Sequence, residues 1–342
     1  MNKTPGILLV NTGSPDSPGV ADVRRYLNQF LMDDRVLDAP APLRRLIVSG
    51  FILPFRPKRS AEAYRSIWWE DGSPLVVLSR RLQQAVQAQL DMPVALAMRY
   101  QHPSLDEGLA ELLRAGVSDI LLVPLFPQYA MSTVLSAVEE TERALARSRS
   151  SAALHVLPPF YHDARFIAAL IDNARPSLAQ GFDHLLFSYH GLPERHLRKT
   201  DPTHAHCLRV TDCCTVDSPA HSTCYRHQVL ATTDLFVQQA DIPADRYSVS
   251  FQSRLGQDAW LQPATASELP RLARAGVRRI AVISPAFVTD CLETLEEIAE
   301  GGRNLFLEAG GQSFTMIPAL NTHPAWVSTL SQLCREAAAR IA

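Results

Sequence analysis

The sequence lacks the features that mark secreted, membrane-spanning and nucleic-acid-binding proteins. No secretory signal precedes the first apolar stretch, which begins at Gly6, and no apolar run approaches the roughly 20 residues that span a bilayer. The 33 basic and 35 acidic residues give a formal net charge of -2, so no overall basic field would attract nucleic acid. We therefore expect a cytoplasmic protein that has no nucleic-acid partner.

Cysteine is sparse as well, with six residues in a chain of 342. In a reducing compartment these residues should be metal ligands, buried thiols or reactive thiols rather than disulfides. The remaining composition, 46% hydrophobic and 20% charged, is typical of a globular protein. A chain of this length is expected to form two domains, each with its own core.

Short apolar runs alternate with segments of helical periodicity along the whole chain. The runs predict strands at residues 6–11, 94–98, 120–125, 153–157, 184–188, 247–251, 280–284 and 314–317. Helical segments separate them, among them residues 22–31, 79–90, 105–115 and 325–341. Strands that alternate with helices predict an α/β fold with parallel, doubly wound sheets.

An internal repeat indicates that the second half copies the first. The string LRAGV at residues 113–117 precedes one predicted strand, and ARAGV at residues 273–277 precedes another. We predict two similar domains, residues 1–157 and 158–342, with the C-terminal helix assigned to the second and its packing back across the boundary left open. The carboxyl edges of their sheets, where ligands bind in open α/β folds, would line a shared cleft.

Chemically active residues follow two predicted strands of the second half. His190 follows the strand at residues 184–188, and its imidazole can take a proton or hold a metal near neutral pH. Asp290 and Glu293 follow the strand at residues 280–284, and Glu296, Glu297 and Glu300 continue at helical spacing. This ladder of carboxylates would pass a divalent cation or a proton. The alternatives are a D-x-x-E capping box for its first members and a solvated helix face for the rest.

Residues 43–59 form an unusual segment with an apolar centre and basic residues on both flanks. Its apolar centre is too short to cross a bilayer. Three interpretations remain open for it: a lip that lies on a membrane surface, a cover over an apolar ligand, and a helix buried in the core.

Several motifs, taken in chain order, resemble those of the ferrochelatases. They are LVNTGSP (9–15), FPQY (126–129), SYHGLP (188–193), FQSRLG (251–256), DCLETL (290–295) and IPALN (317–321). The match covers nearly the whole chain. The resemblance implies a lyase that inserts Fe²⁺ into protoporphyrin IX at the last step of haem biosynthesis, in a cleft between two similar α/β domains. It favours protoporphyrin over coproporphyrin as the substrate.

The resemblance also implies roles for individual residues. His190 and Glu293 match the central histidine and glutamate that face the macrocycle nitrogens and the incoming Fe²⁺, and Asp290 matches a neighbouring acid. The division of roles between His190 and Glu293 stays open. Residues 43–59 match an apolar cover through which some family members touch membranes. Positions that contact the macrocycle or its propionates match Thr12, Arg65, Arg99, Tyr100, Ser253 and Trp260.

A cysteine-rich insert at residues 204–227 departs from the simplest family pattern. Cys207, Cys213, Cys214 and Cys224 are spaced C-x5-C-C-x9-C, and four thiols within 18 residues indicate a metal centre. Four thiolates suit either a [2Fe–2S] cluster or tetrahedral Zn²⁺. Resemblance to the bacterial ferrochelatases with cysteines in this region implies the cluster. One of four nearby histidines would be able to replace Cys213 or Cys214: His204, His206, His221 or His227.

Two other functions compete with this interpretation. A related chelatase would insert cobalt or nickel into another tetrapyrrole, since sequence motifs encode metal choice poorly. A sensor that binds haem or a cluster without catalysis would need neither His190 nor Glu293, and the presence of both residues argues against it.

Overall fold

The computed structural model describes residues 4–254 and 258–341, so Leu255 and Gly256 of the FQSRLG motif lie outside the described residues. The chain divides into two compact units. The first comprises Met1–Phe126, Met131–Pro158 and Val327–Ala342, and the second comprises Pro127–Ala130 and Pro159–Trp326.

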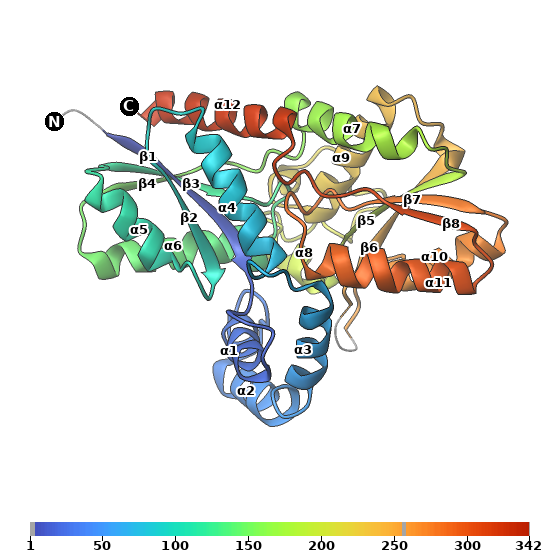
Figure 1. The fold of residues 1–342 in the computed structure, drawn as a ribbon, viewed down its shortest axis with the longest axis horizontal. Coiled ribbons are helices and arrows are strands. Elements are labelled where there is room, and N and C mark those ends of the chain that lie inside the picture. The colour runs from blue at the N-terminus through green and yellow to red at the C-terminus, as the bar shows by residue number, and fades with distance from the viewer. Residues whose placement is uncertain (1–3, 255–257, 342) are drawn as a thin grey trace. The chain divides into compact units, whose positions relative to one another are not determined.

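A four-stranded parallel sheet forms the centre of the first unit, with strand order β2-β1-β3-β4 (Figure 1). Its strands are β1 (Pro5–Gly13), β2 (Val94–Tyr100), β3 (Asp119–Pro124) and β4 (Ala153–Val156). Its helical segments are α1 (Val20–Leu31), α2 (Ala41–Leu46), η1 (Ile47–Ile52), α3 (Arg56–Ile67), α4 (Pro74–Gln87), α5 (Leu105–Arg114), η2 (Met131–Leu135) and α6 (Ser136–Ser148). No helix of the described chain is long and apolar enough to cross a membrane.

Both faces of this first sheet are buried. On one face Leu8 and Val10 of β1 pack into a core with residues of α5 and α6. Alternate residues of a strand point to opposite faces, so Ile7 and Leu9 belong to the other face, and both are fully buried. Helix α4 contacts β1 and β2 on that side, where Asn11 donates a hydrogen bond to Ser79 at 3.2 Å. Continuous apolar strands of this kind are the expected signature of a covered parallel sheet.

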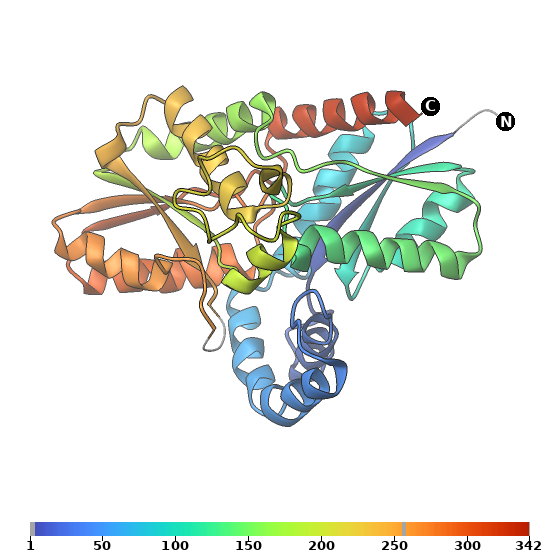
Figure 2. The same ribbon diagram turned by 180° about the vertical axis from the view of Figure 1, so that it is seen from behind.

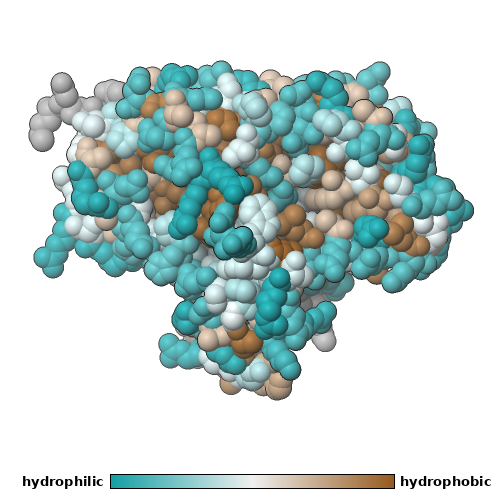
Figure 3. All heavy atoms as spheres, in the orientation of Figure 1, coloured by the Kyte–Doolittle hydropathy of each residue, from teal (hydrophilic) through white to brown (hydrophobic). Residues whose placement is uncertain are grey.

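The segment that follows α1 carries apolar side chains on its surface. Leu43 (48% exposed), Leu46 (58%), Phe51 (67%) and Phe55 (76%) project from α2, η1 and the turn before α3, whereas Val48 is fully buried against the unit. Apolar atoms show at the bottom of Figure 3, over α2 and η1. The interpretation of residues 43–59 as a helix buried in the core is therefore wrong, because four of its large apolar side chains are exposed to solvent.

The second unit repeats the sheet of the first, with strand order β6-β5-β7-β8. Its strands are β5 (His184–His190), β6 (Tyr247–Gln252), β7 (Arg279–Ile283) and β8 (Ser313–Met316). Its helical segments are α7 (Ala164–Leu178), α8 (Glu194–Thr200), η3 (Pro219–Ser222), α9 (Tyr225–Gln239), η4 (Ala244–Arg246), α10 (Thr265–Arg274), η5 (Glu293–Gly302) and α11 (Arg303–Glu308). The predicted fold class, two similar units with parallel sheets, is confirmed.

Helices cover both faces of the second sheet as well. On one face Leu186 and Val282 pack with α10 and with Phe306 of α11. On the other face Phe187 meets Phe236 of α9, with ring centroids 5.3 Å apart. Helices thus cover both faces of the sheet, so polar side chains can reach a ligand at the carboxyl ends of its strands.

Most of the C-terminal helix belongs to the first unit, whereas we assigned it to the second domain. Helix α12 (Pro324–Ile341) begins in the second unit, where Trp326 packs against Phe166, but from Val327 onward it belongs to the first unit. There Arg335 donates a hydrogen bond to the carbonyl oxygen of Gln89 at 3.0 Å. An amphipathic helix shows in its sequence that one face will be covered, but not by which segment.

Candidate active site

His190 ends β5 with a defined ring orientation. Its Nδ1 lies 2.7 Å from the carbonyl oxygen of Gly191. A carbonyl oxygen only accepts, so Nδ1 carries a hydrogen, and proton transfer at this imidazole falls to Nε2. A Cβ at position 191 would lie 2.7 Å from the carbonyl oxygen of Gln252, so the close turn beside His190 requires glycine.

The acidic helix after β7 is a π-helix rather than the expected α-helix. Its first residue is Glu293, and Leu292 stands at the N-cap position. The predicted capping box between Asp290 and Glu293 is wrong, because the Asp290 N–H donates to Asn321 and not to the Glu293 carboxylate. In a π-helix the hydrogen bonds run from i to i+5, which changes which carboxylates overlie one another.

Asp290 is buried, and its hydrogen bonds tie the start of this helix to the chain after β8. Its carboxylate accepts hydrogen bonds from the Thr294 hydroxyl (2.9 Å), the Ala319 N–H (3.2 Å) and the Asn321 amide (2.7 Å). Asn321 in turn accepts from the Asp290 N–H at 2.9 Å. This geometry makes Asp290 an anchor of the loop that presents Glu293.

Glu297 is a candidate functional residue that the sequence did not single out from the row of carboxylates. Its carboxylate accepts hydrogen bonds from both the N–H (2.7 Å) and the hydroxyl of Ser253. Burial raises the pKa of Glu297 and the nearby charge of Glu293 adds to this, whereas the Ser253 hydroxyl and His190 oppose the shift. Glu297 thus lies within electrostatic reach of both predicted catalytic residues.

Ser253 and Gln252 connect the three elements of this site. Ser253 has a left-handed backbone (φ 66), which is costly for a residue with a side chain and directs its donors to Glu297. Gln252 accepts from the Ser188 hydroxyl (2.7 Å) and reaches the Glu293 carbonyl oxygen at 3.4 Å. The structure therefore brings together residues of β5, β6 and η5 in the second unit.

Trp260, expected at the macrocycle, is buried in the same unit. Its backbone forms an isolated antiparallel β-bridge with Pro193 in the turn after β5. A Cβ added at Gly191 would lie 3.2 Å from the Trp260 ring. Its indole nitrogen is buried and has no hydrogen-bond partner among the described residues. In this position Trp260 supports the turn that carries His190.

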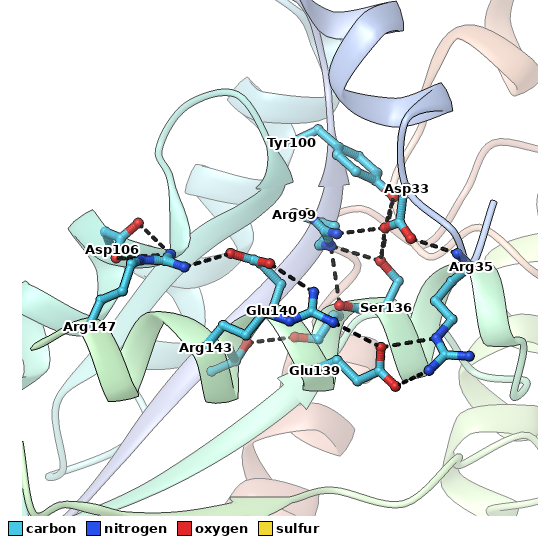
Figure 4. Close-up of polar contacts among 12 residues, drawn as sticks. Asp33, Arg35, Arg99, Tyr100, Asp106, Ser136, Glu139, Glu140, Arg143 and Arg147 are labelled. Carbon is cyan, nitrogen blue, oxygen red and sulfur yellow. Dashed lines mark hydrogen bonds and ion pairs between the residues drawn. The ribbon is translucent and has the colours of Figure 1, made fainter. Parts of the chain in front are cut away.

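The other expected substrate residues belong to the first unit, where Arg99 and Tyr100 form a buried polar cluster (Figure 4). The Arg99 guanidinium (side chain 11% exposed) pairs with Asp33 at 2.5 Å, and the Tyr100 hydroxyl donates to Asp33 at 2.8 Å. Burial alone would raise the pKa of Asp33, but the Ser136 hydroxyl and Arg99 outweigh it and lower the pKa. Arg99 thus already has an anionic partner. Ion pairs continue from this cluster toward the surface through Arg35, Glu139, Arg143, Glu140, Arg147 and Asp106.

Thr12 and Arg65 are the two remaining residues that we expected to contact the substrate. Thr12 is half-buried near the end of β1, where the next residue, Gly13 (φ 103), approaches the Tyr100 carbonyl so closely that a Cβ would lie 2.0 Å from its oxygen. Arg65 is exposed on α3. Its guanidinium is therefore open to a carboxylate ligand.

The four clustered cysteines lie in the segment between α8 and α9, drawn in yellow in Figure 2. All four are free thiols; Cys214 is half-buried and the other three are buried. A hydrogen bond from Cys214 lowers the pKa of Cys224 to about 6, and a hydrogen bond from Cys207 also contributes. Burial raises the pKa of Cys207 well above its usual value, because the charged thiolate is disfavoured there.

These contacts bring the sulfur atoms of the insert together. In residues 4–254 and 258–341, however, no three histidine, cysteine, aspartate or glutamate side chains stand in an arrangement ready to hold a metal ion. Instead, the Cys224 sulfur interacts with the thiols of Cys207 and Cys214 through hydrogen bonds, and Cys213 acts on Cys207 and Cys214 through its charge. Deprotonation on metal binding would remove these hydrogen bonds and leave four sulfur donors.

Two solved structures that are described as SirB share the fold of this chain at low sequence identity. SirB from Bacillus subtilis with Fe³⁺ matches with a TM-score of 0.54 at 15% identity, covering 98% of this chain and 96% of that chain. The sirohydrochlorin chelatase SirB from Bacillus subtilis subspecies spizizenii in complex with cobalt matches with a TM-score of 0.55 at 14% identity, covering 98% and 95%.

Sequence comparison gives the family. The Ferrochelatase family model matches residues 4–338. The ferrochelatase of Azotobacter vinelandii is 55% identical over 332 residues, covering 96% of this chain and 98% of the relative. The ferrochelatases of Stutzerimonas stutzeri and Pseudomonas fluorescens are each 53% identical over 333 residues, covering 97% of both chains. The chain belongs to the ferrochelatase family.

Replacing Glu297 with glutamine should change how stability depends on pH. Because the pKa of Glu297 is raised in the folded state, the neutral carboxyl favours folding, and this contribution is lost as the pH rises through the folded-state pKa. We expect the Tm of Glu297→Gln, relative to wild type, to increase between pH 5 and pH 8 in thermal melts. The matched control is Glu300→Gln, at an exposed position of the same helix. A Tm difference that stays constant with pH would contradict the assignment.

Proposed function

We propose that this chain is a ferrochelatase: a lyase that inserts Fe²⁺ into protoporphyrin IX and releases two protons, the terminal step of haem biosynthesis. Membership of the family over nearly the whole chain supports the activity. The gathering of His190, Glu293 and Glu297 at one edge of the second sheet is the observation that carries it. Insertion of a metal requires groups that remove two pyrrole protons, and this edge offers a basic imidazole nitrogen beside two carboxyl groups.

We assign a role to each group from its contacts. His190 Nε2 accepts a pyrrole proton, because Nδ1 is engaged with the Gly191 carbonyl oxygen. Glu293 attracts Fe²⁺ with its carboxylate, and Glu297, whose pKa is raised, carries protons away from the site. Asp290 acts through position alone, since its carboxylate already accepts three hydrogen bonds.

The porphyrin would be held by the remaining sequence-predicted residues. The exposed Arg65 guanidinium suits a propionate, and Arg99 would have to share its charge between a propionate and Asp33. Thr12, Tyr100, Ser253 and Trp260 complete the proposed contact set. A cobalt or nickel chelatase and a non-catalytic sensor are not favoured, because the relatives named above are ferrochelatases over almost their entire length.

The activity is tested by mixing anaerobic protein with protoporphyrin IX and Fe²⁺ and following the porphyrin's visible bands. Wild type should give the metalloporphyrin spectrum, and His190→Ala should be at least about 100-fold slower, the usual contribution of a proton-transfer residue. His162→Ala, at an exposed position of the same unit, is the control and should match wild type. Porphyrin binding without insertion of Fe²⁺ or Co²⁺ by wild type would refute the catalytic proposal.

We also propose that Cys207, Cys213, Cys214 and Cys224 hold a [2Fe–2S] cluster. The donor set fits, since four free thiols interact with one another in a mostly buried segment. The segment also holds His204, Leu208 and Asp212 in left-handed conformations, each unfavourable for a residue with a side chain. A bound cluster would cross-link the segment and offset this strain. Since metal insertion transfers no electrons, the cluster's role would be structural or regulatory.

Replacing Cys224 with serine should remove the visible chromophore and lower the soluble yield. Wild type purified without oxygen should contain about two iron and two sulfide per chain, and the variant less than half of that. Cys334→Ala, a buried thiol in α12, should keep the chromophore. One zinc per chain without sulfide would support the alternative Zn²⁺ site, and an unchanged spectrum in Cys224→Ser would refute Cys224 as a ligand.

Finally, we propose that the protein is cytoplasmic and rests on the inner face of the membrane through residues 43–59. The exposed Leu46, Phe51 and Phe55 supply apolar contact, and exposed basic residues flank them: Arg45, Arg56, Lys58 and Arg59. Apolar insertion combined with attraction to anionic lipid is the usual basis of such binding.

Serine at both Phe51 and Phe55 should weaken binding to anionic phosphatidylglycerol vesicles by at least about tenfold, because two phenylalanine side chains no longer insert. Co-sedimentation with the vesicles measures this. Leu305→Ser, at an exposed apolar position of the second unit, is the control and should bind like wild type. Equal binding by the double variant and wild type would remove residues 43–59 as the contact.

A further inference from the structure

Three histidine rings of the cysteine-rich insert form one packed group. His206 lies in the segment after α8, His221 in η3 and His227 in the first turn of α9. The rings of His221 and His227 stack face to face, with centroids 3.7 Å apart and planes inclined by 5°. His206 packs edge-on against His221, at 5.5 Å and 71°. We call His206, His221 and His227 the histidine triad.

All three rings meet the backbone of the vicinal cysteines. His206 Nε2 lies 2.6 Å and His221 Nε2 2.9 Å from the carbonyl oxygen of Cys213. His227 Nδ1 lies 2.8 Å from the carbonyl oxygen of Cys214. Carbonyl oxygens only accept hydrogen bonds, so each of these ring nitrogens carries a hydrogen and donates it. Two consecutive peptide groups thus receive three hydrogen bonds from side chains.

The vicinal pair needs such support, because two adjacent cysteines do not point their thiols to one centre in regular backbone. In an extended strand neighbouring side chains point to opposite faces. Here Asp212, immediately before the pair, has a left-handed backbone (φ 52), and the Leu208 N–H donates to the Cys213 sulfur at 3.4 Å. Fixing the peptide planes of Cys213 and Cys214 fixes the directions of both Cα–Cβ bonds.

The other two cysteines are held by different means. Asp201 is buried, and its carboxylate accepts hydrogen bonds from the N–H groups of His206 (2.8 Å) and Cys207 (2.9 Å). Cys224 is the N-cap residue of α9, and its carbonyl oxygen accepts a hydrogen bond from the Gln228 N–H at 3.1 Å. Only the vicinal pair depends on imidazole rings for its backbone hydrogen bonds.

The triad is itself anchored from α9. The buried Gln228 donates to the carbonyl oxygens of His221 (3.1 Å) and Ser222 (3.0 Å), which holds η3 against the helix. The same side chain accepts from the Tyr129 N–H at 2.7 Å. These contacts hold the rings of His221 and His227 in place, so that both can donate their hydrogen bonds to the cysteine carbonyl oxygens.

We propose that His206, His221 and His227 are positioning residues of the cysteine centre. They hold the carbonyl groups of Cys213 and Cys214 so that both thiols of the pair face Cys207 and Cys224. This inference rests on the proposed metal centre at the four cysteines. It gives the histidines a role through the backbone, and the sequence-based alternative, in which a histidine replaces one thiol as ligand, is not needed to complete four donors.

The test compares variants that keep or lose the donor. His206→Phe and His221→Phe keep an aromatic ring and lose the N–H, whereas His206→Gln and His221→Gln keep an N–H donor. The control is His204→Asn, because His204 lies in the same segment with an exposed ring and Asn tolerates its left-handed backbone (φ 55). Each protein is purified without oxygen, and iron, sulfide and zinc per chain are measured together with the spectrum of the reduced centre.

We expect the Phe variants to hold at least threefold less metal than wild type, the Gln variants to recover most of it, and His204→Asn to match wild type. Wild-type metal content in both Phe variants would overturn the inference. If the Phe variants do not fold, the Gln variants decide: retained metal supports the role of the N–H, and loss overturns it. Wild type without bound metal would instead refute the metal centre itself. If wild type holds zinc, the variants are compared with it by zinc per chain.

Discussion

The parallel pairing of β5 with β6 and β7 is the constraint on which the candidate active site depends. His190 pairs in register with Gln252, so the two strands end side by side. Both faces of the sheet are covered, which leaves the carboxyl edge as the place where polar groups reach a ligand. The first unit uses the same strand order, and its strand β2 ends in Arg99 and Tyr100 at the corresponding edge.

At that edge, hydrogen bonding decides what each acid can do. Asp290 is buried and Glu297 is half-buried. Asp290 accepts three hydrogen bonds, whereas Glu297 accepts hydrogen bonds from Ser253 and lies near the charge of a second carboxylate. The first arrangement suits an anchor and the second a proton carrier. The unfavourable backbone of Ser253 is the structural cost of presenting both of its donors to one carboxylate.

The cysteine insert is held together by other interactions than the sheets are. It has little regular structure, and side-chain hydrogen bonds take the place of a backbone ladder. Asp201 accepts the N–H of Cys207, the histidine triad holds the carbonyl groups of Cys213 and Cys214, and Cys224 is the N-cap residue of α9. Such a segment reaches a stable fold most readily when its thiols share a ligand.

The sequence by itself determined the fold class, because strand burial and helical periodicity are local patterns. It also contained the motifs at the strand ends, and these motifs gave the family. It did not reveal the π-helix at Glu293, since an i to i+5 hydrogen bond leaves no distinct residue pattern. The tertiary structure alone decided that Ser253 meets Glu297, that Arg99 pairs with Asp33, and that α12 continues in the first unit. These contacts join segments far apart in the chain, so only packing brings the partners together.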